Sequence, residues 1–98
     1  MNARISIDGE MTIYRAAELK ERLVDALAEC DALLEVNLAE VTEIDTAGIQ
    51  VLMLIKREAL ATGRELRLLA HSRPVVAALE LLNLAAFFGE PLLVEGEP

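Results

Sequence analysis

Apolar and polar residues alternate in two short runs near the amino terminus, Ala3–Ile7 and Glu10–Tyr14. The dipeptide Asp8-Gly9 stands between them. Asp-Gly between two alternating runs is typical of a two-residue β-hairpin turn, because both turn positions need positive φ angles. The chain is therefore expected to open with a hairpin of two strands.

The next periodic segment has the spacing of an amphipathic helix. Apolar residues recur every three or four positions from Ala16 to Cys30, and charged residues fill most of the other face. Leu33–Leu38 then predicts a strand, followed by a loop and a second helix from Thr46 or Ala47 to Thr62. Gly63 comes next, and glycine supplies the left-handed conformation with which helices often end.

The carboxyl-terminal third continues the alternation of strand and helix. Leu66–Ala70 predicts a strand, and a third helix opens at Ser72, with Pro74 in its first turn, and runs to about Leu82. Asn83–Gly89 is expected to be irregular or briefly helical. Leu92–Val94 could add an edge strand, and the residues from about 95 to 98 are expected to fray.

This order of elements predicts one α/β domain over residues 1–98. We expect a mixed sheet of four or five strands, including the hairpin, with three or four helices packed on it. The connection through the second helix should be a right-handed parallel crossover. That geometry places the loops Ala39–Asp45 and His71–Arg73 side by side, beyond the carboxyl ends of neighbouring strands, where open α/β sheets usually bind their ligands.

Composition narrows the classes of partner. The formal net charge is −8, from 17 acidic and 9 basic residues, which disfavours nucleic acids and anionic membrane surfaces. Val51–Ile55 is far too short to cross a bilayer, so no direct membrane insertion is expected. Met1–Asp8 lacks the basic flank and apolar centre of a signal peptide, and we therefore expect a cytoplasmic protein.

The inventory of catalytic groups is poor. His71 is the one histidine, it has no obvious nucleophile partner, and we interpret it as a solvent-facing loop residue. Cys30 is the one cysteine and is interpreted as a small buried hydrophobe. No glycine-rich phosphate loop is present. We expect no enzymatic activity, no cofactor and no metal site.

The second helix has an unusual surface. Projected at about 100° per residue, one side carries residues suited to packing on the sheet, namely Gly48, Val51, Leu52, Ile55 and Ala59. The opposite side carries polar residues, but also large apolar ones, namely Thr46, Gln50, Arg57, Ile49, Met53 and Leu60. Apolar side chains rimmed by polar ones indicate a surface for another protein. The alternative is that a neighbouring helix or the carboxyl end of the chain covers them.

Thr46 stands where this helix begins, directly after Asp45. Either residue could cap the helix. A hydroxyl at a helix amino terminus is also a favourable place for a phosphate, because backbone N–H groups and the helix dipole stabilise the added charge. A phosphate on Thr46 would lie beside the apolar side chains and could switch docking off.

The segment Val36–Ile55, with Ile44-Asp45-Thr46-Ala47-Gly48-Ile49 inside it, resembles the STAS domain family of sulphate transporters and anti-sigma factor antagonists. The family motif is an apolar strand, a short loop, Asp-Ser-Ser-Gly or a close variant, and an apolar helix. The strand from Gly63 to Ala70 and the helix from Pro74 to Leu82 extend the likeness over nearly the whole chain.

The resemblance implies a regulatory domain that docks a partner through the loop and amino end of the second helix. In anti-sigma factor antagonists a serine/threonine kinase both binds this region and phosphorylates the first hydroxyl residue after the Asp, here Thr46. Asp-Thr-Ala-Gly is closer to relatives in lipid-transport complexes or chemotaxis-type signalling. Two partner classes therefore remain open, an anti-sigma-type kinase or other signalling protein, and a transporter ATPase or permease. The expected contact residues are Asp45, Thr46, Ile49, Gln50, Met53 and Arg57.

Overall fold

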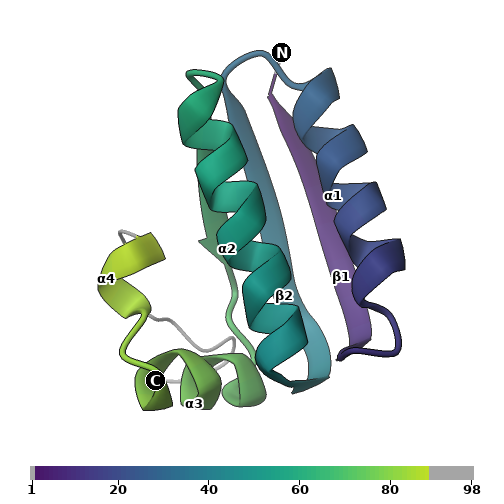
Figure 1. Cartoon of the computed structure of the whole chain (residues 1–98), viewed down its shortest axis with the longest axis vertical. Helices are drawn as coiled ribbons and strands as arrows, with labels where there is room; N and C mark the ends of the chain where they lie inside the picture. The colour runs from purple at the N-terminus through teal and green to yellow at the C-terminus, as the bar shows by residue number, and fades with distance from the viewer. Residues whose placement is uncertain (1, 89–98) are drawn as a thin grey trace.

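The computed structural model describes residues 2–88, which form a two-layered arrangement of one sheet with helices on one of its faces (Figure 1). The elements in chain order are β1 (Ala3–Met11), α1 (Ala16–Glu29), β2 (Leu33–Ile44), α2 (Thr46–Ala61), β3 (Glu65–Leu69), α3 (Arg73–Leu81) and α4 (Ala85–Phe88). Within the described residues the strands make a parallel sheet in the order β1-β2-β3.

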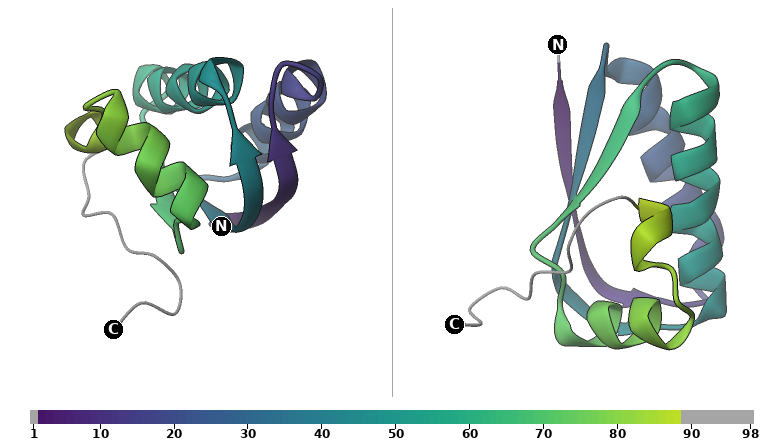
Figure 2. Two further views of the ribbon diagram at one scale, coloured as in Figure 1. Left: turned by 90° about the horizontal axis from the view of Figure 1, so that it is seen from below. Right: turned by 90° about the vertical axis from the view of Figure 1, so that its left-hand side faces the viewer.

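The helices α1 and α2 lie side by side on one face of the sheet, and α3 lies at the end where the strands finish (Figure 2). Alternation along β2 produces this arrangement, because Leu34, Val36 and Leu38 are fully buried toward the helices while Glu35 and Asn37 between them face away. The core is aliphatic, and Cys30 belongs to it at 2% exposure, as the sequence predicts.

The predicted amino-terminal hairpin is wrong. β1 runs without interruption through Asp8-Gly9 and pairs in parallel with β2 along its whole length. Gly9 does take a positive φ of 74°, but the register shifts beside it mark a bulge in a continuous strand. The hairpin prediction rests on the dipeptide Asp8-Gly9 alone. Pairing with β2 instead provides hydrogen-bond partners for the backbone groups on both sides of this dipeptide.

The same pairing corrects the expected loop Ala39–Asp45. β2 continues to Ile44, and its second half pairs with the second half of β1, with Gly9 opposite Val41 and Met11 opposite Ile44. The described sheet is therefore purely parallel and three-stranded instead of mixed and four- or five-stranded. The edge strand expected at Leu92–Val94 and the frayed tail lie outside the described residues.

The remaining elements agree closely with the sequence prediction. Helices begin at residues 16, 46 and 73, and β3 matches the predicted strand. Gly63 has a φ of 73° directly after α2, which is the left-handed helix ending that the sequence predicts. The segment after residue 82 contains the short helix α4. These elements were predictable because the residues that indicate each of them lie within the element itself or directly beside it.

Candidate functional site

Asp45 fixes the start of α2. Its Oδ1 accepts a hydrogen bond from the backbone N–H of Gly48 at 3.1 Å, which is the standard helix cap. Its Oδ2 accepts a second bond from the N–H of Ile13 at 3.0 Å, and its own N–H donates to the carbonyl of Met11 at 3.2 Å. One carboxylate therefore joins the first turn of α2 to the turn that follows β1.

These contacts favour the ionised carboxylate. The hydrogen bond from Ile13 contributes most and, with further backbone bonds including that from Gly48, holds the pKa of Asp45 below its ordinary value of 3.8, against the opposing effect of desolvation. The cap is therefore negatively charged at neutral pH, where it also complements the positive end of the helix dipole.

Gly48 explains why the first turn of α2 can lie so close to β1. A Cβ at this position would overlap the carbonyl oxygen of Met11 and would come within 3.0 Å of Cγ1 of Ile44. Only a residue without a side chain fits, because the obstructing atom is backbone and cannot move aside cheaply. The glycine of the sequence motif is thus a packing requirement.

Thr46 is exposed at the first position of α2. Of the two residues that could cap the helix, Asp45 does so, and the threonine hydroxyl is not needed for that purpose. The structure therefore places a solvent-exposed residue with a hydroxyl at the amino end of a 16-residue helix.

The other expected contact residues divide into two groups. Gln50 and Arg57 are exposed and Met53 is half-buried, but Ile49 is buried at 2% exposure and belongs to the core. The expectation of an exposed Ile49 is wrong, because α2 is flanked as well as covered, so its buried arc is wider than a helix lying alone on a sheet would have (Figure 2). Leu60, near the far end, is 64% exposed.

The carboxyl-terminal region covers part of the expected stripe. The guanidinium of Arg57 lies 5.8 Å from the centre of the Phe87 ring of α4, at cation–π distance. Met53 and Phe87 both pack against the edge of the hydrophobic core. The alternative of coverage by the chain itself therefore holds for one flank of α2.

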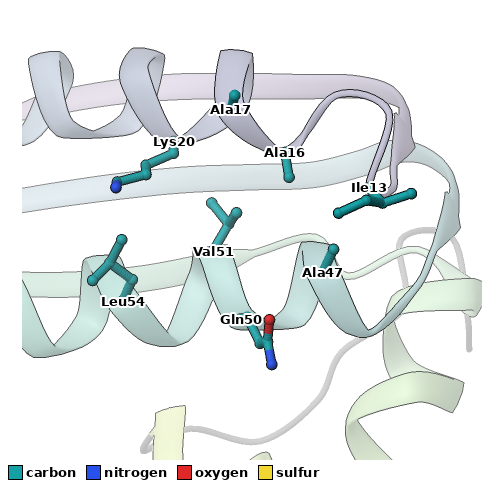
Figure 3. A pocket seen from close by; sticks show the side chains of 8 residues that line it. All are labelled: Ile13, Ala16, Ala17, Lys20, Ala47, Gln50, Val51 and Leu54. Atoms are coloured by element: carbon teal, nitrogen blue, oxygen red, sulfur yellow. The ribbon is translucent and has the colours of Figure 1, made fainter.

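On its other flank α2 lies against α1, and an apolar groove opens to solvent between the two helices (Figure 3). The groove has a volume of about 230 Å³ and is lined by Ile13, Ala16, Ala17, Lys20, Ala47, Gln50, Val51 and Leu54. A second hollow of about 360 Å³ adjoins it along α2, lined by Gln50, Met53, Leu54 and Arg57. Ile13, at the mouth of the groove, is 63% exposed.

Sequence reasoning missed the half of this groove that α1 and its preceding turn contribute. Two signals were available in the sequence. Ala16 and Ala17 place only small side chains at the start of the amphipathic helix, and the apolar Ile13 stands shortly before them. That these residues face α2 depends on the helix–helix packing, which a single-helix projection does not contain.

His71 is buried at 2% exposure, so the prediction of a solvent-facing loop residue is wrong. Ala70 has a φ of 54°, and the chain turns there so that His71 and the following Ser72 both lie inside. β2 and β3 run in the same direction, but Leu69 at the end of β3 pairs with Asn37, so β2 continues beyond it to Ile44 and the two strands do not end side by side as expected (Figure 1). Helix α3 packs against β2.

A parallel β-sheet with two helices on one face and a capped helix end at its carboxyl edge defines a small α/β domain. A family model described as "Mlab, STAS domain" matches residues 2–95. The chain belongs to the STAS domain family, which confirms the resemblance seen in the sequence. STAS domains are in general protein-interaction modules and not enzymes.

A crystal structure of a sulfate transporter family protein from Wolinella succinogenes has the same fold. It is 23% identical to this chain, with a TM-score of 0.75, and the match covers 90% of this chain and 71% of that one. At this identity the likeness establishes the fold alone. Within residues 2–88, none of the helices has the length and apolar character needed to cross a bilayer.

Proposed function

We propose that this STAS domain binds a partner protein through one surface, here named the docking face. It consists of the groove between α1 and α2 together with Thr46, Met53 and Arg57. The observation that carries the proposal is the open apolar groove directly beside an exposed Thr46 at the amino end of α2. Exposed apolar surface with a polar rim is the usual composition of a protein interface.

We further propose that phosphorylation of Thr46 by a partner kinase switches this docking off. The support is positional, since the residue is exposed and its neighbour Asp45 already caps the helix. A phosphate adds a charge of about −1.5 to −2. Ala47, the next residue, lines the groove, so that charge would stand at the groove's end and oppose burial of an apolar partner.

The second candidate is constitutive docking on the ATPase or permease of a transporter complex, without a switch. It is favoured by the structural neighbour, which is itself described as a sulfate transporter family protein. Both candidates use the docking face, and they differ in whether the state of Thr46 matters.

Site-specific photo-crosslinking separates these possibilities. A crosslinking amino acid at Gln50, in the docking face, should capture a protein in native cells, whereas the same group at Ser6, on the far face of the sheet, should not. Mass spectrometry identifies the captured protein. Equal capture from both positions would refute the docking face.

The switch is tested in the same cells with Thr46→Glu and Thr46→Ala. We expect Thr46→Glu to lower capture by about tenfold or more, because tenfold corresponds to only about 1.4 kcal/mol and burying an unpaired carboxylate costs more than that. Thr46→Ala should leave capture nearly unchanged. Equal capture by both variants would refute the switch and favour a constitutive subunit. Intact-mass analysis of the natural protein shows whether a phosphate is present.

A further inference from the structure

The walls of the docking face have an unusual charge for this chain. The groove and the adjoining hollow are lined by ten residues in all, of which two are cationic, Lys20 and Arg57, and none is acidic. The whole chain has 17 acidic and 9 basic residues. This surface without acidic residues extends onto α1 as far as Lys20. A third hollow, on the far side of Lys20, includes Glu21 in its lining.

From this charge and shape, and resting on the docking function proposed above, we infer that the occupant of the groove is an amphipathic helix of the partner with an apolar face and acidic flanks. The two cations lie on opposite helices, Lys20 on α1 and Arg57 on α2. Acidic residues along both edges of an incoming helix would therefore meet one cation each.

The backbone chemistry of the groove selects a helix over an extended strand. Both walls are helices, whose backbone groups beyond the first turn bond within the helix. The lining side chains are mostly apolar, with Gln50 and Lys20 as the polar exceptions. A strand docked there would leave its own N–H and C=O groups without partners, whereas a helix satisfies them internally. Ala16, Ala17 and Ala47 leave room for a close approach.

The length of the groove fits about three helical turns. Together with the adjoining hollow, its lining on α2 extends from Ala47 to Arg57, a rise of about 15 Å at 1.5 Å per residue. An incoming helix of about ten residues covers that distance and presents apolar side chains at three- and four-residue spacing to Val51 and Leu54.

The overall charge of −8 does not oppose this assignment at physiological ionic strength. Screening limits exposed charges to a range of about 8 Å, so Lys20 in the groove and Arg57 in the adjoining hollow act more strongly on a docked helix than more distant acids do. The same local balance supplies a reason for the switch, since a phosphate on Thr46 would add the charge that an acidic partner avoids.

A displayed library of helical peptides tests the inference. The apolar positions are kept, the flanking positions vary among Glu, Lys and Gln, and the library is selected separately against the full chain, Lys20→Glu and Arg4→Glu. Lys20 is used because Arg57 also contacts Phe87. Arg4→Glu is the matched control, because it changes net charge equally on the open face of the sheet.

We expect the full chain and Arg4→Glu to enrich Glu at the flanks, and Lys20→Glu to enrich Lys at the flank that faces α1. Selected Glu-rich peptides should bind Lys20→Glu at least tenfold more weakly. Binders with the same flanking charges for all three proteins would overturn the acidic partner but leave docking intact. A library without binders would overturn the helical occupant, and the crosslinking experiment decides the docking face independently.

Discussion

Asp45 joins segments of the chain that are 32 positions apart, because the two oxygens of one carboxylate bond to Gly48 at the start of α2 and to Ile13 after β1. Gly48 permits that junction by leaving space for the carbonyl of Met11. These two residues therefore fix where the first turn of α2 lies relative to the end of β1. They thereby also fix the position of Thr46 and of the mouth of the groove.

The ionisation of Asp45 should give a measurable pH dependence of stability. Because the folded-state pKa is below 3.8, the stabilising contribution of the carboxylate is fully present above the unfolded pKa and is lost as the pH falls through the folded pKa. We expect Asp45→Asn to be less stable than the natural protein at neutral pH, and the difference to shrink below about pH 4.

Urea unfolding of both proteins from roughly pH 7 to pH 3 measures this difference. A neutral control is Gln50→Ala, which should follow the natural protein at every pH. A stability difference between Asp45→Asn and the natural protein that stays constant down to the lowest pH would show that the charge of the cap contributes nothing.

At the scale of elements, α2 has neighbours on three sides. The sheet lies beneath it and α1 lies on one flank (Figure 2), and on the other flank Arg57 meets the Phe87 side chain of α4. Its buried residues accordingly include Ile49 in addition to the sheet-facing Leu52 and Ile55. The exposed side left for a partner is the strip that contains Gln50 and borders α1.

Substitutions on adjacent positions of α2 should therefore differ sharply. We expect Ile49→Ala to lower the free energy of unfolding by about 2–5 kcal/mol, since it opens a cavity in a closed core. Gln50→Ala should change it by less than about 0.5 kcal/mol. Chemical denaturation followed by circular dichroism compares the two. Similar small losses for both would place Ile49 outside the core and restore it as a contact residue.

At the scale of the whole molecule, β1 is an edge strand of the described sheet, and such an edge can pair with another chain. Arginines of the α1 region occupy its carbonyl groups. Arg15 Nη1 donates to the carbonyls of Asp8 at 2.6 Å and Glu10 at 2.7 Å, and Arg22 Nη2 donates to that of Ser6 at 3.3 Å. These bonds leave fewer acceptors for strand addition along this edge.

Removing both side chains should open the edge. We expect Arg15→Ala combined with Arg22→Ala to raise the weight-average mass of the protein in solution above that of the natural chain at the same concentration. Arg4→Ala combined with Arg67→Ala removes the same charge from the open sheet face and serves as the control. Light scattering after size-exclusion chromatography measures the mass. Equal masses for all three proteins would contradict edge protection.

The sequence by itself determined the features whose physical causes are local. Three- and four-residue spacing indicated α1, Gly63 marked the end of α2, and Ser72 with Pro74 marked the start of α3, since helix periodicity and helix ends depend on a few consecutive residues. Two possible caps were recognised at the start of α2, and the motif around Thr46 indicated the family. Even the positive φ of Gly9 was predicted from the dipeptide that contains it.

Tertiary structure decided what depends on segments distant in the chain. Pairing with β2 turned the expected hairpin into one strand, because backbone groups bond to whichever strand lies beside them, and the register allowed Gly9 as a bulge. Packing against neighbours buried Ile49 and His71, which a projection of isolated segments leaves outside. The groove exists only because α1 brings Ala16 and Lys20 alongside α2, so its shape and its charge are properties of the assembled fold.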